Sequence, residues 1–282
     1  QFSRVADARL FGGTAVVFFD SGHVRVDTLT IESSAVRLTA QGGLGITAAR
    51  RDSLSIAMIV DSLGGLRPWL SPTDSTTRAF VLAGDTLRGS IELSAQLSGS
   101  IDTLDPRGLD LRLRGDARDV HVATSRAQRA SVDLAVRDVL RAANGALSAT
   151  MDSAQFAGID IASAAGQSTL RGGLAERFGV QMRTSSESRV AMAGGVARNG
   201  DSTVVNIDTL TLRVDSASAR PRGFTLVAPA MLRFMPGANG TLGSLDSLVL
   251  QHTDTGRIAM RGGLAAGGVV TGRLDADRVA LA

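Results

Sequence analysis

The stretch that decides the fold runs from Gly89 to Gly99 and reads Gly-Ser-Ile-Glu-Leu-Ser-Ala-Gln-Leu-Ser-Gly. From Ile91 to Leu97 its apolar side chains alternate one for one with Glu, Ser and Gln. Successive side chains of a β-strand point to opposite faces, so this pattern predicts a strand with one apolar face and one polar face. Such strands are typical of an antiparallel sheet with one side in water, because parallel strands are usually apolar on both faces.

The same alternation recurs along the chain, for example at residues 109–114 and 147–152. Residues 125–144 are ambiguous, because their apolar positions also fit the stripe of a helix that ends near Gly145. The part from Val132 to Val136 alternates equally well as a strand. Since strand patterns flank this segment on both sides, we predict that it too is β.

The tripeptide Asp-Ser/Thr-Leu recurs, and three copies lie in a longer frame at residues 26–31, 207–212 and 245–250. In that frame, apolar residues before and after the Asp-Ser/Thr pair are an odd number of positions apart. They would lie on opposite faces unless one extra residue is absorbed, so we predict a β-bulge or tight turn at each pair. Calcium ligation would need Asp and Gly at short fixed intervals, which are missing. The copies begin at Asp27, Asp52, Asp61, Asp85, Asp102, Asp208 and Asp246.

Double glycines recur along the chain. Two of them, at residues 42–44 and 262–264, are followed by Leu and come after an Asp-Ser/Thr-Leu frame. A loop that cradles phosphate would need Lys and Ser/Thr after the glycines, and the chain has no lysine. We therefore predict turns or bulges at all of these sites. The pairs interpreted in this way begin at Gly42, Gly64, Gly172, Gly194 and Gly262.

The composition favours an apolar surface over a thick core. The 282 residues are 44% hydrophobic but only 4% aromatic, and 32 of them are glycine. A compact core usually relies on large aromatic side chains. We expect an all-β fold: a long antiparallel meander of about 20 to 25 strands, curled into an elongated taco-like groove with an apolar concave face. We also expect a short helix near 62–70, and one continuous repetitive segment over 1–282 with a minor break at 67–78.

Charge and residue usage argue against several functions. The formal net charge is +3, and arginines are interleaved with acidic residues, which does not favour nucleic-acid binding. The absence of cysteine excludes a disulfide framework and a thiolate metal site. His23, His121 and His252 are far apart in sequence, so we expect isolated surface side chains and no metal site. The sequence has no Gly-x-Ser-x-Gly motif for a nucleophilic serine, and it has few aromatic residues that could stack on sugar rings. We therefore expect neither an enzyme nor a cofactor.

The sequence shows neither a signal peptide nor a run of about 20 apolar residues that could span a membrane as a helix. Its first residue is Gln1 and not methionine. We expect a fragment of a longer protein whose anchoring segment lies outside it.

Residues 87–100, with the pattern Leu-x-Gly-x-Ile-x-Leu followed by Leu-x-Gly, resemble the repeat region of the AsmA-like superfamily, in particular its TamB-like translocation and assembly module family. The hairpin patterns at 119–122, 131–134, 145–149, 158–161 and 168–173 continue the resemblance. It implies a taco-shaped sheet in the periplasm, tethered to the inner membrane. It further implies phospholipid transport along an apolar groove and an outer-membrane assembly partner protein of the Omp85 type.

In this interpretation the aliphatic side chains of successive strands line a trough for acyl chains, and no catalytic group is needed. A structural or adhesive β-solenoid with a packed core remains the alternative, and a carbohydrate-active enzyme on a β-scaffold is a third. The expected lining residues are Val24, Val26, Leu29, Ile31, Ile91, Leu93, Leu97, Leu109, Leu111, Leu113, Leu134, Val136, Leu147, Leu210, Leu212, Leu248 and Leu250.

Overall fold

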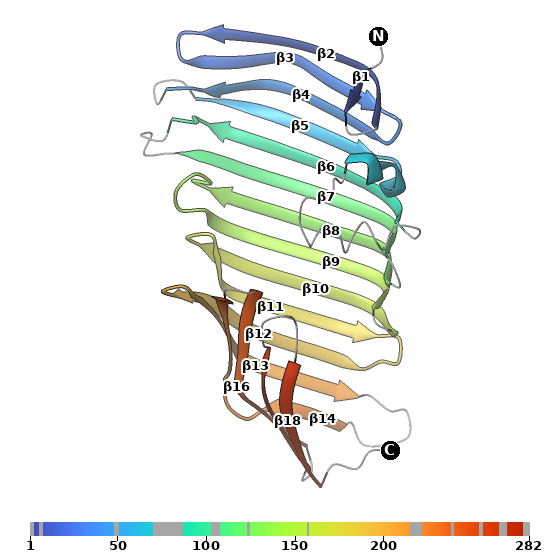
Figure 1. Ribbon diagram of the computed structural model, residues 1–282, viewed down its shortest axis with the longest axis vertical. Helices are drawn as coiled ribbons and strands as arrows, with labels where there is room; N and C mark the ends of the chain where they lie inside the picture. The colour runs from blue at the N-terminus through green and yellow to red at the C-terminus, as the bar shows by residue number, and fades with distance from the viewer. Residues whose placement is uncertain are drawn as a thin grey trace. The chain divides into compact units, whose positions relative to one another are not determined.

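The computed structural model is all-β, and its described residues form one antiparallel sheet of 18 strands (Figure 1). Successive strands are neighbours, as in a meander, except that β13 pairs with both β14 and β15. The predicted fold class is therefore confirmed, whereas the groove stays a prediction. The structure describes residues 3–5, 8–47, 51–69, 87–102, 108–122, 125–156, 158–214, 222–237, 240–253, 256–264 and 270–278.

The chain divides into two units, residues 1–163 and 164–282, and the division falls within β10 (Ile159–Arg171). Most of the break expected at 67–78 lies outside the described residues. The strands of the first unit are β1 (Ser3–Val5), β2 (Ala8–Asp20), β3 (His23–Ser33), β4 (Val36–Gly45), β5 (Asp52–Val60), β6 (Arg88–Gly99), β7 (Leu109–Val122), β8 (Ser125–Arg137) and β9 (Asn144–Phe156).

The second unit continues the antiparallel pairing from β11 onward. Its strands are β11 (Leu174–Thr184), β12 (Arg189–Asn199), β13 (Ser202–Val214), β14 (Arg222–Leu226), β15 (Ala230–Gly237), β16 (Gly240–His252), β17 (Arg257–Leu264) and β18 (Val270–Asp277).

The described residues contain fewer strands than the 20 to 25 that we expected. That estimate assumed one strand and turn for every 10 to 12 residues. Here β7 alone has 14 residues, and β8 and β9 have 13 each. The ambiguous segment 125–144 is a strand up to Arg137, which confirms the choice of β over helix.

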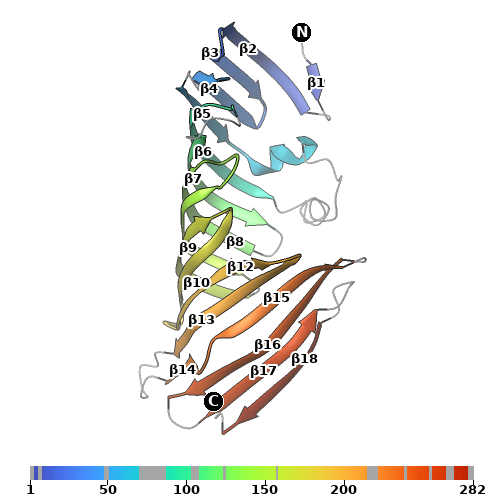
Figure 2. The ribbon, with the colours of Figure 1, turned by 90° about the vertical axis from the view of Figure 1, so that its left-hand side faces the viewer.

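The short helix predicted near 62–70 is present as a 3-10 helix, η1 (Leu63–Trp69). Figure 2 shows it on one side of the first unit's sheet, beside β5 and β6. Val60, Leu63 and Ala35 are all buried at this corner, where a side chain at Gly65 would collide with Ala35. The helix therefore covers one corner of the sheet.

Strand register decides which side chains share a face, because residues directly opposite each other in adjacent strands point the same way. Ile56 of β5 lies opposite Ala95 of β6, which lies opposite Leu113 of β7. Leu113 in turn lies opposite Leu134, and Leu134 opposite Leu147. One aliphatic row thus crosses five strands on a single face.

The three Asp-Ser/Thr-Leu copies that lie in the longer frame, at residues 26–31, 207–212 and 245–250, form β-bulges, as predicted. The pairing register shifts between Val26 and Leu29 in β3, and between Leu245 and Leu248 in β16. In β13, Ile207 and Thr209 lie opposite adjacent residues of β12, so Asp208 is the extra residue. Each bulge keeps the apolar residues on both of its sides on one face of the sheet.

The double glycines near these bulges are not in turns but inside strands, directly across from the bulged segment. Gly42 lies opposite Val26, Gly194 opposite Ile207, and Gly262 opposite Leu245. A side chain at any of the three would collide with a backbone carbonyl oxygen of an adjacent strand. The glycines therefore let the strands approach closely where a bulge distorts the pairing.

The remaining double glycines differ from one another. Gly172 and Gly173 form the turn between β10 and β11, with φ of +60° and +77°. Gly64 and Gly65 lie in η1, where we had expected a turn or bulge.

Gly42→Ala should lower the free energy of unfolding by about 1–3 kcal/mol, because its φ is +119° and a Cβ would collide with Ser53 O. Gly12→Ala is the matched control, because no heavy atom lies within 4 Å of the position that its Cβ would take and its φ is not in the left-handed region; it should change stability by less than about 0.5 kcal/mol. Urea titration followed by far-UV circular dichroism measures both values. Equal effects for the two variants would contradict the role assigned to Gly42.

Candidate functional site

The most extensive surface feature of the first unit is a half-exposed apolar face. All candidate lining residues from Val24 to Leu147 lie on it, as the register of β3 to β9 requires. Leu109 and Val136 are buried and Ile31 is exposed, while the other candidates are half-buried. We call this surface the apolar face; its members are Val24, Val26, Leu29, Ile31, Ile56, Met58, Ile91, Leu93, Leu97, Leu109, Leu111, Leu113, Val132, Leu134, Val136 and Leu147.

Half-burial of these side chains comes from neighbours within the same sheet. Among the helices and strands that the structure describes in the first unit, η1 is the one element outside the sheet, and it covers one corner of this face. In a packed sandwich, the inward side chains of one sheet interdigitate with those of another and lose most of their exposure. Leu93, Leu111 and Leu134 keep an intermediate exposure instead. The apolar face is thus accessible over most of its described extent.

The size of the apolar face exceeds that of an ordinary surface patch. From β3 to β9 it measures roughly 30 Å across the strands and about 30–45 Å along them, at about 4.8 Å per strand and 3.3 Å per residue. The largest apolar patch of a typical monomer covers about 300–600 Å². A surface of this area marks a site for a partner, a membrane or a ligand.

The second unit has an apolar face of its own, which contains the other four candidates. Leu212 lies between Val190 and Phe224, and Leu226 lies opposite Leu250. Register in β14 and β16 therefore puts Leu210, Leu212, Leu248 and Leu250 on one face of this unit. All four side chains are half-buried.

The opposite face of the first unit is polar and holds a shallow depression with a volume of about 870 Å³. Hydroxyl and amide side chains line it together with Arg112 and Arg114. Arg114 Nε donates to Asp133 Oδ2 at 2.9 Å, and both side chains are exposed. Exposed ion pairs of this kind contribute about 0–1 kcal/mol, so they mark a solvated face.

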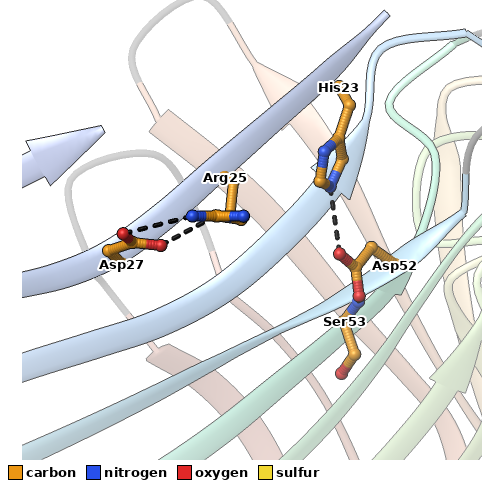
Figure 3. A network of polar contacts seen from close by, with 5 residues as sticks. All are labelled: His23, Arg25, Asp27, Asp52 and Ser53. Atoms are coloured by element: carbon orange, nitrogen blue, oxygen red, sulfur yellow. Dashed lines mark hydrogen bonds and ion pairs between the residues drawn. The ribbon is translucent and has the colours of Figure 1, made fainter. Parts of the chain in front are cut away.

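A small polar cluster lies at one end of β3 to β5 (Figure 3). His23 Nε2 lies 3.0 Å from Asp52 Oδ2, and Asp52 Oδ1 accepts a hydrogen bond from the Ser53 backbone N–H at 2.7 Å. A side chain at Gly43 would collide with both His23 and Asp52, so the glycine makes room for the pair. The cluster joins β3 to β5 across β4.

Within the bulge of β3, Arg25 donates two hydrogen bonds to Asp27, at 2.7 and 3.3 Å. The guanidinium carbon of Arg25 also lies 5.2 Å from the ring centroid of Phe18. The Asp27 carboxylate therefore binds a side chain of its own strand, which agrees with a structural role for this aspartate.

Two of the three histidines differ from the isolated surface side chains that we expected. His23 pairs with Asp52, as described above, and only 19% of its side chain is exposed. The His252 ring packs edge-on against Phe224, with 4.9 Å between ring centroids. His121 is exposed. The expectation was wrong for His23 and His252 because their neighbours come from strands distant in sequence.

Neither a metal site nor a membrane-spanning helix is found in the part of the chain that the structure describes. No group of three or more His, Cys, Asp or Glu residues is placed to hold a metal ion there. None of its helical segments has the length and apolar character to cross a bilayer.

Sequence reasoning missed part of the apolar face: Ile56 and Met58 in β5, Val132 in β8, and the whole of β2. Val17 lies opposite Val26, and Phe19 opposite Val24, so both extend the apolar face. Phe19 is 75% exposed. The signal in the sequence was a run of four large apolar residues, Val16 to Phe19, which hides the alternation because both faces of β2 are apolar.

Comparisons of the chain with protein-family models, with curated proteins and with solved structures gave no match in any of the three.

Leu113→Ala should lower the free energy of unfolding by about 1 kcal/mol, because the apolar face leaves this side chain half-buried. Leu109→Ala, in the same strand and on the same face, should cost about 2–5 kcal/mol, since Leu109 is 7% exposed. Chemical denaturation of both variants gives the comparison. A loss at Leu113 as large as that at Leu109 would indicate that a second layer covers the apolar face.

Proposed function

We propose that the apolar face binds the acyl chains of phospholipids and lets them move along the sheet from strand to strand. The observation that carries this proposal is the continuous row of half-exposed aliphatic side chains across β5 to β9. A protein with such a surface needs an apolar occupant, because water in contact with it is unfavourable. Hydrocarbon chains meet that requirement without specific polar contacts.

The chemistry of the surface fits transport better than tight binding. Burial of an acyl chain contributes about 0.8 kcal/mol per CH₂ wherever it occurs. The rows Leu38-Met58-Leu93 and Ile56-Ala95-Leu113 offer similar aliphatic contacts at each strand. A chain that slides along them meets neither a deep pocket nor a charged side chain that would hold it in one place.

The resemblance described above supports the same function. It adds the proposals that the protein works in the periplasm, tethered to the inner membrane through a segment outside this sequence, and that it acts in outer-membrane biogenesis. An outer-membrane assembly protein of the Omp85 type is the partner that it implies. We propose no enzymatic step and no cofactor, because sliding of an acyl chain breaks no bond.

The alternative is a structural or adhesive β-solenoid whose sheet packs a dry core. A solenoid of this kind would bury its aliphatic side chains against an opposing sheet. The intermediate exposure of Leu93, Leu111 and Leu134 argues for the lipid-binding proposal instead.

Single-cysteine variants test the proposal directly, because the chain contains no cysteine. Leu93→Cys puts an environment-sensitive fluorophore on the apolar face, and Ser94→Cys puts it on the polar face of the same strand. On addition of phospholipid vesicles or short-chain phospholipid, the emission of the label at position 93 should shift to shorter wavelength. The label at position 94 should keep its emission.

Lipid extraction and native mass spectrometry of the chain purified from a diderm bacterial host should detect bound phospholipid. Leu93→Asp should reduce the bound amount several-fold, and Ser94→Asp should leave it unchanged. A lipid-free protein whose label at position 93 also fails to respond to phospholipid would refute the proposal.

A further inference from the structure

We propose that a cluster of arginines on the polar face of the first unit is a binding site for closely spaced phosphate groups. The cluster comes from β6, β7 and β8, which are neighbours in the sheet (Figure 1). This inference goes beyond the lipid-binding proposal and does not depend on it, because acyl chains would occupy the opposite, apolar face. We call this site the arginine cluster; its members are Arg88, Arg118, Arg126 and Arg129, together with His121.

Strand register brings these side chains together in two short rows. In the first row, His121 of β7 lies opposite Arg88 of β6 and also opposite Arg126 of β8. In the second row, Arg118 of β7 lies directly opposite Arg129 of β8. All five side chains are exposed.

A further bulge keeps the two rows on one face of the sheet. Just after Arg88, β6 advances by two residues where β7 advances by three, from His121 back to Arg118. One extra residue of β7 is absorbed beside Asp119, whose φ of +50° lies in the left-handed region. Arg118 and His121 therefore share a face although they are an odd number of positions apart.

The arrangement of the second row is unfavourable in the absence of a ligand. Like charges that lie directly opposite each other in a sheet lower its stability, and Arg118 and Arg129 are such a pair. Another arginine of the same strand and face, Arg114, lies opposite Asp133 instead and forms an ion pair with it. A bound anion would remove the repulsion between Arg118 and Arg129.

The nearest carboxylates leave the arginine cluster unpaired. Asp152 lies opposite Arg129, Asp119 lies in the bulge, and Glu92 and Asp116 lie in the next row of the polar face. Within the part of the chain that the structure describes, no member of the cluster forms an ion pair or a side-chain hydrogen bond with any of these carboxylates. The guanidinium N–H groups are therefore available to donate to a ligand.

The chemistry of the site favours phosphate. A guanidinium group presents its N–H donors in a planar fork that matches two phosphate oxygens. Neighbouring strands lie about 4.8 Å apart, so the cluster extends roughly 10 Å across its three strands. This spacing suits two or more phosphate groups that lie close together. Such groups occur in a soluble molecule with linked phosphates and at the surface of an anionic phospholipid bilayer.

Isothermal titration calorimetry with inorganic tripolyphosphate tests the site in the full chain. The unmodified chain should bind with a dissociation constant below about 100 µM at low ionic strength. The double variant Arg118→Gln, Arg129→Gln should bind at least about tenfold more weakly, because it loses charge-assisted hydrogen bonds. The control is the double variant Arg112→Gln, Arg137→Gln, which removes one exposed arginine from each of the same two strands. Its affinity should change by less than about twofold.

Thermal unfolding gives a second measurement on the same three chains. Without ligand, the Arg118→Gln, Arg129→Gln variant should melt about 1–2 °C above the unmodified chain, because the repulsion is gone. Tripolyphosphate should raise the melting temperature of the unmodified chain and of the control, but not that of the cluster variant. An equal rise in all three chains would place the bound phosphate elsewhere and overturn the proposal.

Co-sedimentation with vesicles distinguishes the two sources of phosphate. All three chains carry Leu93→Asp in this experiment, so that the apolar face contributes little to the retention of protein. If phosphatidylglycerol vesicles retain the control better than the cluster variant, and phosphatidylcholine vesicles do not, the ligand is a membrane surface. If tripolyphosphate discriminates between the variants and the vesicles do not, the ligand is soluble.

The proposal is overturned if neither tripolyphosphate nor phosphatidylglycerol vesicles discriminate between the cluster variant and the control. Its failure can be told apart from failure of the proposed function. Leu93→Asp should leave the affinity for tripolyphosphate unchanged, and the cluster variant should leave the emission shift of the label at position 93 unchanged when short-chain phospholipid is added.

Discussion

The whole sheet depends on one geometric constraint: paired strands must keep their apolar side chains on a common face, and a slip of one residue inverts a strand. Three strands carry an extra residue that would cause such an inversion. The bulges at Asp27, Asp208 and Asp246 absorb it. Across from each bulge a glycine leaves space for a neighbouring carbonyl oxygen. Bulge and glycine thus act together, and without them each of these strands would turn part of its apolar face to the opposite side.

A single-layer sheet gains its stability differently from a packed core. Each cross-strand pair contributes about 0.2–1 kcal/mol, and β6 to β9 supply such pairs along nearly their full length. The hydrophobic free energy of the half-buried Leu and Ile side chains is only partly realised, because water still reaches them. The surface that contributes least to folding per residue is therefore the one left able to bind an apolar partner. Stability of the sheet and the proposed binding of lipid draw on the same side chains.

Local patterns predicted most of the fold because β-structure has a short period. The alternation from Ile91 to Leu97 and the odd spacing from Val26 to Leu29 are both readable within a few residues. Pairs between distant strands were not readable in this way. His23 and Asp52 are 29 residues apart, and only the close approach of β3, β4 and β5 brings them to 3.0 Å. The same holds for Gly42 and Val26, whose relation depends on strand register.

By itself the sequence determined an all-β chain, the side chains that share an apolar face, and the positions of the bulges, because each follows from side-chain alternation along one strand. Tertiary structure alone decided that the apolar face of the first unit is half-exposed, since exposure depends on what lies across from a surface and not on the residues that form it. It also decided that His23 reaches Asp52 and that Gly42 lies across from Val26. Both relations depend on which strands are neighbours in space, and no pattern within one strand records its neighbours.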